Sequence, residues 1–251
     1  MVLKIGIFDS GLGGLSLLRE LQQLIPSAEY FYIADQANAP YGEKSPEFIL
    51  KRCQELTESL LEKEVNMVVV GCNTATAEGI NWLRARFSIP FVGIEPYLNI
   101  INQREFSKAE DLAVLTTTAT LKSTRFVELK KRLDPEGKIS TYASSELAAL
   151  IELSLERGEW DSQIATELKM LQGKGHTHLI LGCTHYPLIE EIISQQLKVT
   201  CISPGREVAN RVLEVLADKL PQGGALEGSL SFMSTRDMNW GRLPQWPLLN
   251  F

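Results

Sequence analysis

The stretch VVVGCNT at residues 68–74 decides the fold, because three β-branched apolar residues run directly into glycine, cysteine and two polar residues. A second stretch, LILGCTH at 179–185, repeats the same order. Uninterrupted apolar triplets are typical of strands that are buried on both faces of a parallel sheet. The polar residues that follow predict the start of a helix. We interpret the two stretches as a weak internal repeat of strand, Gly-Cys turn and helix.

Further short apolar runs continue this rhythm on both sides of the repeat. We expect strands at 5–8, 30–34, 67–70, 91–94, 112–115, 178–181 and 199–202, with amphipathic helices between most of them. The helix expected at 45–63 has Ser45 as a good N-cap and Pro46 at its first position. Strands that alternate with helices predict an α/β fold whose mainly parallel sheets are flanked by helices on both faces.

The chain changes character at two places, near Glu95-Pro96 and near Ser203-Pro204-Gly205. We expect a central lobe of residues 96–204, inserted into an outer lobe formed by residues 1–95 and 205–251. A helix expected at 206–220 then returns to the outer lobe. At 251 residues the chain is long enough for two such lobes.

Composition and charge narrow the class of protein. Apolar residues make up 44% and charged residues 22% of the chain, as in ordinary globular proteins. A net charge of −6 offers no broad basic surface, so we expect a small-molecule ligand and no nucleic acid. No signal-peptide pattern and no apolar run of about 20 residues is visible, which predicts a cytoplasmic protein without a membrane segment.

The four cysteines are Cys53, Cys72, Cys183 and Cys201. In the reducing cytoplasm they are not expected to form disulfides. None belongs to a Cys-x-x-Cys pair, and the three histidines show no zinc-type spacing with them, so no metal site is expected. Cys53 lies in the middle of an expected helix and Cys201 in a short strand, and we assign both to packing.

Polar residues gather where the expected strands end. They are Asp9-Ser10-Gly11 after the first strand, Asp35 after the second, 71–74 after the third, Glu95-Pro96 after the fourth, and 182–185 near the end. In parallel α/β sheets, ligands bind beyond the carboxyl ends of the strands. We therefore expect the functional site at this edge.

Cys72 and Cys183 both follow such a strand, with a helix expected to start immediately after them. The positive end of a helix favours the thiolate over the thiol. A single buried cysteine is more often a small hydrophobic residue. Two equivalent cysteines on facing lobes, however, match racemisation, in which one group removes an α-proton and another delivers a proton to the opposite face.

The first turn, DSGLGGLS at 9–16, invites a dinucleotide-binding interpretation. In the pattern G-x-G-x-x-G the third glycine would fall at Ser16, so the fingerprint fails and a nicotinamide-dependent oxidoreductase is a weakened alternative. The glycines still form a tight turn whose N–H groups can hold an anion such as a substrate carboxylate. Asp9 is open to three roles: acceptor for an ammonium group, proton partner of a cysteine, or helix cap.

A second loop, DQANAPYG at 35–42, follows the next strand. Pro40 and Gly42 give it a fixed turn whose backbone can approach a ligand closely, whereas Tyr41 alone is more often a packing residue. His185 lies two residues after Cys183 and can orient that thiol or exchange protons with it. His176 and His178 flank the start of a strand and are interpreted as structural.

These motifs together resemble the glutamate racemases of the aspartate/glutamate racemase superfamily. They are DSGLGG at 9–14, Asp35 through PYG at 40–42, CNTA at 72–75 and GCTHYP at 182–187, all in the expected order. The resemblance implies two pseudo-symmetric lobes with the active site in the cleft between them. It also implies a cofactor-independent isomerase, usually a dimer, that converts L-glutamate to D-glutamate for peptidoglycan, and so for cell wall biogenesis and cell shape.

The resemblance assigns roles residue by residue. Cys72 and Cys183 become the two proton donors and acceptors, with Asp9 assisting Cys72 and His185 assisting Cys183. Glu152 lies where the family has a glutamate beside the second thiol. Substrate contacts are implied for Asp9, Ser10, Tyr41, Gly42, Asn73, Thr74, Thr117, Thr120, Thr184 and His185.

Two segments depart from the family pattern. Residues 141–147 lack the Cys-Pro pair that precedes the family's glutamate, and residues 202–205 lack an expected aspartate. These losses motivate an alternative, an amino-acid-binding or regulatory homologue with reduced or lost turnover. An aspartate-preferring racemase is a further alternative. If this enzyme is unusual, we expect the half-reaction of Cys183 to be affected.

Overall fold

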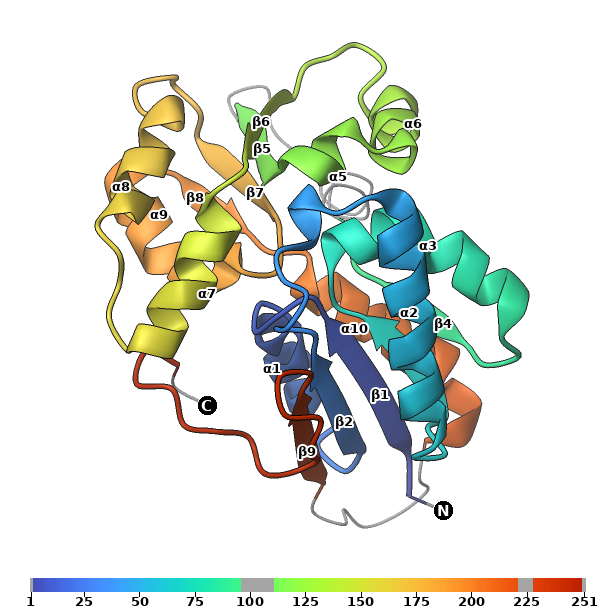
Figure 1. The fold of residues 1–251 in the computed structure, drawn as a ribbon. Helices are drawn as coiled ribbons and strands as arrows, with labels where there is room; N and C mark the ends of the chain where they lie inside the picture. The colour runs from blue at the N-terminus through green and yellow to red at the C-terminus, as the bar shows by residue number, and fades with distance from the viewer. Residues whose placement is uncertain (1, 96–110, 221–227, 250–251) are drawn as a thin grey trace.

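The computed structural model describes residues 2–95, 111–220 and 228–249, and these contain two separate parallel sheets (Figure 1). The first sheet has five strands in the order β4-β3-β1-β2-β9, and the second has four in the order β6-β5-β7-β8. Every strand pair in both sheets is parallel. The expected α/β class is therefore confirmed. The start of the expected central lobe at residue 96 lies outside the described residues.

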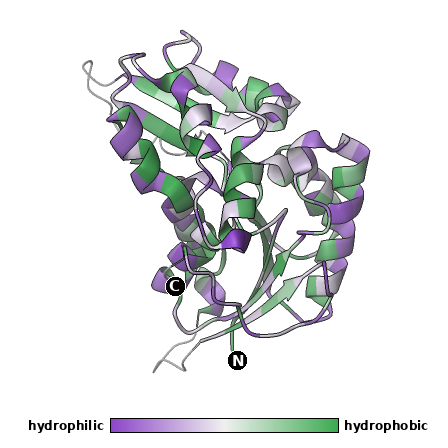
Figure 2. Cartoon of the chain, turned by 60° about the vertical axis from the view of Figure 1, so that its left-hand side comes forward, coloured by the Kyte–Doolittle hydropathy of each residue, from purple (hydrophilic) through white to green (hydrophobic). Residues whose placement is uncertain are grey.

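The five-stranded sheet contains β1 (Lys4–Asp9), β2 (Glu29–Ala34), β3 (Met67–Val70), β4 (Phe91–Gly93) and β9 (Ser229–Ser234). Helices α1 (Leu15–Leu24) and α10 (Gly205–Val215) cover one face, and α2 (Pro46–Leu61) and α3 (Asn73–Arg86) cover the other. The two-residue alternation of β1 explains these layers, because Ile5 and Ile7 face α1 whereas Phe8 faces α2 and α3. Figure 2 shows these apolar strands between helices that also carry polar residues.

The four-stranded sheet contains β5 (Leu112–Thr117), β6 (Ser140–Ser144), β7 (His178–Gly182) and β8 (Thr200–Ile202). Its helices are α5 (Thr118–Lys122), α6 (Thr124–Leu133), α7 (Leu147–Arg157), α8 (Gln163–Glu167) and α9 (Glu190–Leu197). Single 3₁₀ turns lie at η1 (Tyr41–Glu43), η2 (Leu168–Leu171), η3 (Tyr186–Ile189) and η4 (Ala217–Lys219). The end of α7 lies beside the C-terminal segment that follows β9 (Figure 1).

Several element boundaries differ from the sequence-based expectation. The helix expected at 206–220 ends at Val215 and is followed by η4, although it does pack against α1 of the outer lobe. Strands β6 and β9 were not expected, because serine and threonine interrupt their apolar pattern at the sheet edges. Helix α2 matches its expectation closely, since Ser45 Oγ accepts the N–H of Phe48 at 3.3 Å.

Strand register determines which residues lie side by side at the carboxyl ends of the two sheets. Phe8 pairs with Val70, so Ser10 and Cys72 each lie two residues beyond this pair. In the second sheet Thr116 pairs with Gly182, which brings Thr117 level with Cys183. Among the described residues, no helix is long and apolar enough to cross a membrane.

Candidate active site

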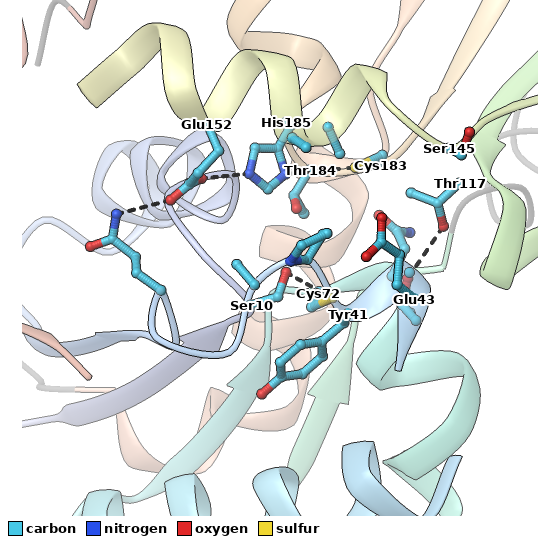
Figure 3. Close-up of a pocket in the computed structure, with 18 of the residues that line it drawn as sticks. Ser10, Tyr41, Glu43, Cys72, Thr117, Ser145, Glu152, Cys183, Thr184 and His185 are labelled. Carbon is cyan, nitrogen blue, oxygen red and sulfur yellow. Dashed lines mark hydrogen bonds and ion pairs between the residues drawn. The ribbon is translucent and has the colours of Figure 1, made fainter. Parts of the chain in front are cut away.

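A cavity of about 210 Å³ lies at the carboxyl ends of both sheets (Figure 3). This volume is below the ~300–1,000 Å³ of clefts that hold drug-sized ligands, so the cavity suits a small molecule. Each lobe supplies residues that directly follow its strands. These are Ser10 after β1, Gln36 after β2, Cys72 after β3, Thr117 at the end of β5, Ser145 after β6 and Cys183 after β7. The strand-end rule thus located the cavity.

Most of the site residues expected from the sequence line this cavity. Ser10, Tyr41, Gly42, Cys72, Asn73, Thr74, Thr117, Glu152, Cys183, Thr184 and His185 do so. Asp9 and Thr120 are not among its lining residues, and both are fully buried. Asp9 and Thr120 can therefore influence a ligand in the cavity only through the lining residues that they contact.

Cys72 is the N-cap of α3, as the sequence predicted. Its Sγ accepts the N–H of Ala75 at 3.4 Å and donates to Ser10 Oγ at 3.5 Å. Burial raises the pKa of the Cys72 thiol to about 12, and the nearby Asp9 adds to the effect. The expected preference for thiolate is therefore wrong at Cys72, because desolvation outweighs the helix end.

Cys183 does not lie at a helix N-terminus, and that expectation is also wrong. The chain tightens instead into a turn in which the N–H of Tyr186 donates to the Cys183 carbonyl at 3.1 Å. Only the short η3 follows, and α9 begins at Glu190. His185 takes the place of the helix end, with Nδ1 lying 3.7 Å from Cys183 Sγ.

His185 and Glu152 form a buried ion pair behind Cys183, with His185 Nε2 2.7 Å from Glu152 Oε2 (Figure 3). Burial alone would lower the pKa of His185, but its hydrogen bonds to Cys183 and Glu152 raise that pKa well above its ordinary value. Burial opposes ionisation of Glu152, yet the hydrogen bond and charge of His185 hold its pKa below the usual value. A protonated imidazole of His185 therefore faces Cys183 at 3.7 Å.

The glycine turn holds this ion pair. The N–H of Leu12 donates to Glu152 Oε2 at 2.8 Å, and a Cβ on Gly11 would lie 2.6 Å from the same oxygen. A Cβ on Gly13 would overlap the ring of His185. The N–H of Gly11 is bound by Asp9 at 2.9 Å. Two of its N–H groups therefore bind carboxylates of the protein, and the expectation that this turn also holds a substrate carboxylate stays a prediction.

Asp9 holds the turn and connects the lobes. Besides Gly11, its carboxylate accepts from Ser10 Oγ at 3.2 Å and from Thr184 Oγ1 at 2.9 Å. Burial raises the pKa of Asp9. Asp9 is not a helix cap, since α1 begins at Leu15 without a side-chain cap. Its connection to Cys72 runs through the hydroxyl of Ser10.

Polar groups of both lobes meet beside Cys72. Thr74 Oγ1 lies 3.3 Å from the hydroxyls of both Thr117 and Thr120. Thr120 supports this contact from behind, because its hydroxyl accepts from Thr117 at 2.9 Å. Asn73 Nδ2 donates to the Ile94 carbonyl at 3.4 Å, whereas the buried Asn73 Oδ1 has no partner. That oxygen is buried without a partner in a residue that lines the cavity.

Tyr41 turns its hydroxyl away from Cys72 (Figure 3). The hydroxyl donates to Asp35 at 2.5 Å, and Asp35 is also held by Arg52 at 2.8 and 2.9 Å. A Cβ at Gly42 would meet no atom within 4 Å. The side chain of Tyr41 is therefore a support, and the backbone at Gly42 is the part of this loop that is open to a ligand.

In the two segments that depart from the family pattern, the serine hydroxyls form hydrogen bonds with nearby groups. Ser144 Oγ accepts the N–H of Leu147 at 2.9 Å at the start of α7 and donates to Glu167 at 2.6 Å. Ser203 Oγ accepts the N–H of Gly205 at 3.3 Å. Neither segment alters the contacts of Cys183 with His185 or of His185 with Glu152.

The remaining cysteines and histidines lie away from the cavity. Cys53 is buried under α3, where its Sγ would be 3.2 Å from a Cβ at Gly79. Cys201 lies in β8 and is partly buried. His176 links Asp111, at 2.6 Å, to the Tyr142 hydroxyl, at 2.8 Å. Within the described ranges, no group of three or more His, Cys, Asp or Glu residues could hold a metal ion.

Six polar residues of the cavity wall were not expected from the sequence: Gln36, Glu43, Thr118, Ser145, Glu156 and Arg236. Gln36 is the second residue after β2, at the strand end where the sequence indicated Asp35. Arg236 follows β9, a strand that was not expected. The Nη1 atom of Arg236 lies 2.8 Å from Glu156 Oε1, which joins the C-terminal segment to α7.

Two thiols from two facing lobes, one beside a buried cation and one protonated, define an acid–base isomerase of the racemase class. Residues 14–212 match the model of the family described as Asp/Glu/Hydantoin racemase. The chain belongs to this family, and the resemblance to the glutamate racemases seen in the sequence is confirmed.

Individual relatives agree with this assignment. The glutamate racemase of Stutzerimonas stutzeri (strain A1501) is 37% identical over 219 residues, which is 86% of this chain and 82% of that protein. The crystal structure of Escherichia coli glutamate racemase, in complex with L-glutamate and the activator UDP-MurNAc-Ala, is similar with a TM-score of 0.82 and 28% identity, covering 94% and 90% of the two chains. The glutamate racemase isoform RacE1 of Bacillus anthracis is similar with a TM-score of 0.79 and 31% identity, covering 93% and 88%.

Proposed function

We propose that this protein is a glutamate racemase that interconverts L-glutamate and D-glutamate without a cofactor, using Cys183 and Cys72 as its two acid–base groups. The observation that carries the proposal is the pairing of two unlike sulfurs on one cavity (Figure 3). Cys183 has a protonated imidazole at 3.7 Å, whereas Cys72 has a pKa raised to about 12. One sulfur is thus set up as the base and the other as the acid.

The reaction follows from this difference. Cys183, as a thiolate stabilised by His185, takes the α-proton, so that the Cα–H bond breaks and an S–H bond forms. Cys72 then delivers its proton to the opposite face, so that its S–H bond breaks and a new Cα–H bond forms. The other enantiomer reacts with the roles exchanged, and Ser10 provides Cys72 with a hydrogen-bond partner in both states.

Free polar groups on the cavity wall suit an amino acid. Asn73 Oδ1 lacks a partner and can accept from an ammonium group. The hydroxyls of Ser10, Thr74 and Thr117 line the cavity and can turn from their present protein partners to donate to a carboxylate, as can the backbone near Gly42. Thr184 is bound to Asp9 and so holds the lobes together as well as lining the cavity.

The printed names of the relatives favour glutamate over aspartate as the substrate. We further propose the lobe limits 1–95 with 205–251 and 96–204. We propose that the enzyme works in the cytoplasm as a homodimer and supplies D-glutamate for peptidoglycan synthesis. The intact pair of His185 and Glu152 favours turnover over a binding or regulatory role.

One assay separates these functions. The purified chain is incubated with L-glutamate, and separately with L-aspartate, in deuterated water without added cofactor, while α-proton loss and optical inversion are followed. Inversion of glutamate is expected, and it should be abolished by Cys72→Ala or Cys183→Ala. Faster inversion of aspartate would reassign the substrate. Tight glutamate binding without exchange would instead support the regulatory alternative.

A further inference from the structure

Gln36 makes three hydrogen bonds that no catalytic role has yet accounted for. It is the second residue after β2 and is buried, with 8% of its surface exposed. Its Nε2 donates to Glu152 Oε1 at 2.9 Å and to Glu156 Oε1 at 3.2 Å. Its Oε1 accepts from Ser234 Oγ at 2.8 Å. Because ionised carboxylates can only accept, the NH₂ end of the amide must face Glu152 and Glu156, and its oxygen then accepts from Ser234.

The carboxylate of Glu152 depends on this amide for one of its two oxygens. Oε2 is bound by His185 and by the N–H of Leu12, and Gln36 is the donor that the structure gives to Oε1. A carboxylate held at both oxygens cannot rotate about its last bond without breaking a hydrogen bond. Gln36 therefore fixes the plane in which Glu152 faces His185.

Gln36 also controls a neighbouring negative charge. Glu152 and Glu156 lie one helical turn apart on α7, where like charges repel each other. The Nε2 of Gln36 lies between the two carboxylates, and Arg236 compensates Glu156 from the other side. The second carboxylate is thereby kept from displacing the first.

These contacts cross the cleft. Gln36 and Ser234 follow or end strands of the five-stranded sheet, whereas both glutamates belong to α7 of the other lobe. The C-terminal segment also passes from β9 to the end of α7 (Figure 1), where Pro247 would contact a Cβ on Gly158 at 3.3 Å. The outer lobe thus holds α7 at the level of Glu152.

We propose that Gln36, held by Ser234, is a positioning residue for racemisation, which acts through Glu152 to keep His185 aligned with Cys183. This role rests on the proposed racemase function. Together with the Leu12 N–H on Glu152, Gln36 then makes proton transfer at Cys183 depend on contact between the lobes.

The test is a double-mutant cycle on glutamate racemisation. Gln36→Met keeps the length of the side chain and removes all three hydrogen bonds. Because a hydrogen bond to a charged group is lost, kcat should fall about tenfold to hundredfold. In a Glu152→Gln background the same change should alter kcat less than about twofold, because the group it positions has already lost its charge. Equal effects in both backgrounds would overturn the proposal.

A pH profile gives a second readout that general destabilisation would not produce. Loosening Glu152 removes a contact that raises the pKa of His185, so the alkaline limb of activity should move to lower pH in Gln36→Met. An unchanged limb would contradict the proposal. Ser234→Ala leaves Gln36 in place without its anchor, and it should shift the limb in the same direction by a smaller amount. Ser234→Ala replaces Gln36→Met in the cycle if the latter does not fold.

A matched control lies on the outside of α2. Gln54 Nε2 donates to Glu58 at 2.7 Å on the exposed surface, so Gln54→Met makes the same chemical change away from the cavity and should retain full activity. If the unmutated chain exchanges no α-proton, the racemase function itself has failed. If the unmutated chain is active and Gln36→Met matches it, only the positioning role of Gln36 is refuted.

Discussion

Replacing Glu152 by glutamine removes the charge that keeps His185 protonated while leaving the shape of the side chain nearly unchanged. Glu152 and His185 are both buried, with side chains 9% and 7% exposed, and are separated by 2.7 Å. Removing one partner of a buried ion pair costs about 3–5 kcal/mol. We expect a free-energy change of similar size in the activation barrier for α-proton transfer, because the imidazole then loses the charge that stabilises a Cys183 thiolate. At about 1.4 kcal/mol for each factor of ten, kcat/KM at neutral pH should fall at least a hundredfold.

The assay follows optical inversion of L- and D-glutamate between pH 6 and pH 9. Because the two enantiomers are equal in free energy, kcat/KM must fall equally in both directions, whereas kcat need not. Glu159→Gln is the control, since Glu159 is exposed just beyond α7 and no side-chain contact with the cavity involves it. A Glu152→Gln enzyme within threefold of the unmutated enzyme across this range would refute the role given to the ion pair.

Three further results are expected. Gly13→Ala should lower kcat at least tenfold while the protein remains folded, because its Cβ would overlap the ring of His185. In the control variant Gly241→Ala the new Cβ meets nothing within 4 Å, so kcat should stay unchanged. Equal activities of the two variants would contradict this packing. Iodoacetamide at pH 7 should alkylate Cys183 before Cys72, because the two side chains are similarly buried and the pKa of Cys72 is about 12. The modified cysteine is identified by peptide mass spectrometry. Modification of Cys72 first would reverse the assignment of base and acid. The ion pair should stabilise the fold most between about pH 4.5 and 6.5. The pKa of Glu152 is lowered in the folded state, so this stability is lost as pH falls through the lowered pKa. The pKa of His185 is raised in the folded state, so the stability is also lost as pH rises from the ordinary histidine pKa to the raised pKa. Urea titrations of the unmutated and Glu152→Gln chains would show a constant difference across pH if the pair were not ionised.

The sheets could be predicted because their central strands carry a strong local signal. Residues 67–70 are buried on both faces, and so their sequence is uniformly apolar. Strands β6 and β9 lie at sheet edges, where one face meets polar surroundings, and their serine-rich sequences resemble loops. The edge strands β4 and β8 have apolar runs and could be predicted, whereas β6 and β9 are recognised only by their pairing with β5 and β2.

The two sulfurs could be predicted from the repeated Gly-Cys turns, but their different electrostatic surroundings could not. The repeat made Cys72 and Cys183 look alike, whereas only Cys72 starts a helix. The residues that make Cys183 different are distant in sequence: Glu152 bonds to Leu12 across 140 positions and to Gln36 across 116. The carboxylate of Glu152 at the glycine turn was likewise not predicted, because the sequence of a tight turn indicates an anion site but does not identify the anion.

The central claim is that two separate sulfurs act on opposite faces of the substrate, and the first turnovers in deuterated water test it most directly. Protiated L-glutamate is incubated with the enzyme, and the isotopic content at Cα is measured separately in the remaining L-glutamate and in the newly formed D-glutamate. Two acid–base groups predict D-glutamate that carries deuterium from its first appearance, while the remaining L-glutamate stays mostly protiated. D-glutamate that retains the original proton would show that one group transfers it between faces, and would contradict the account.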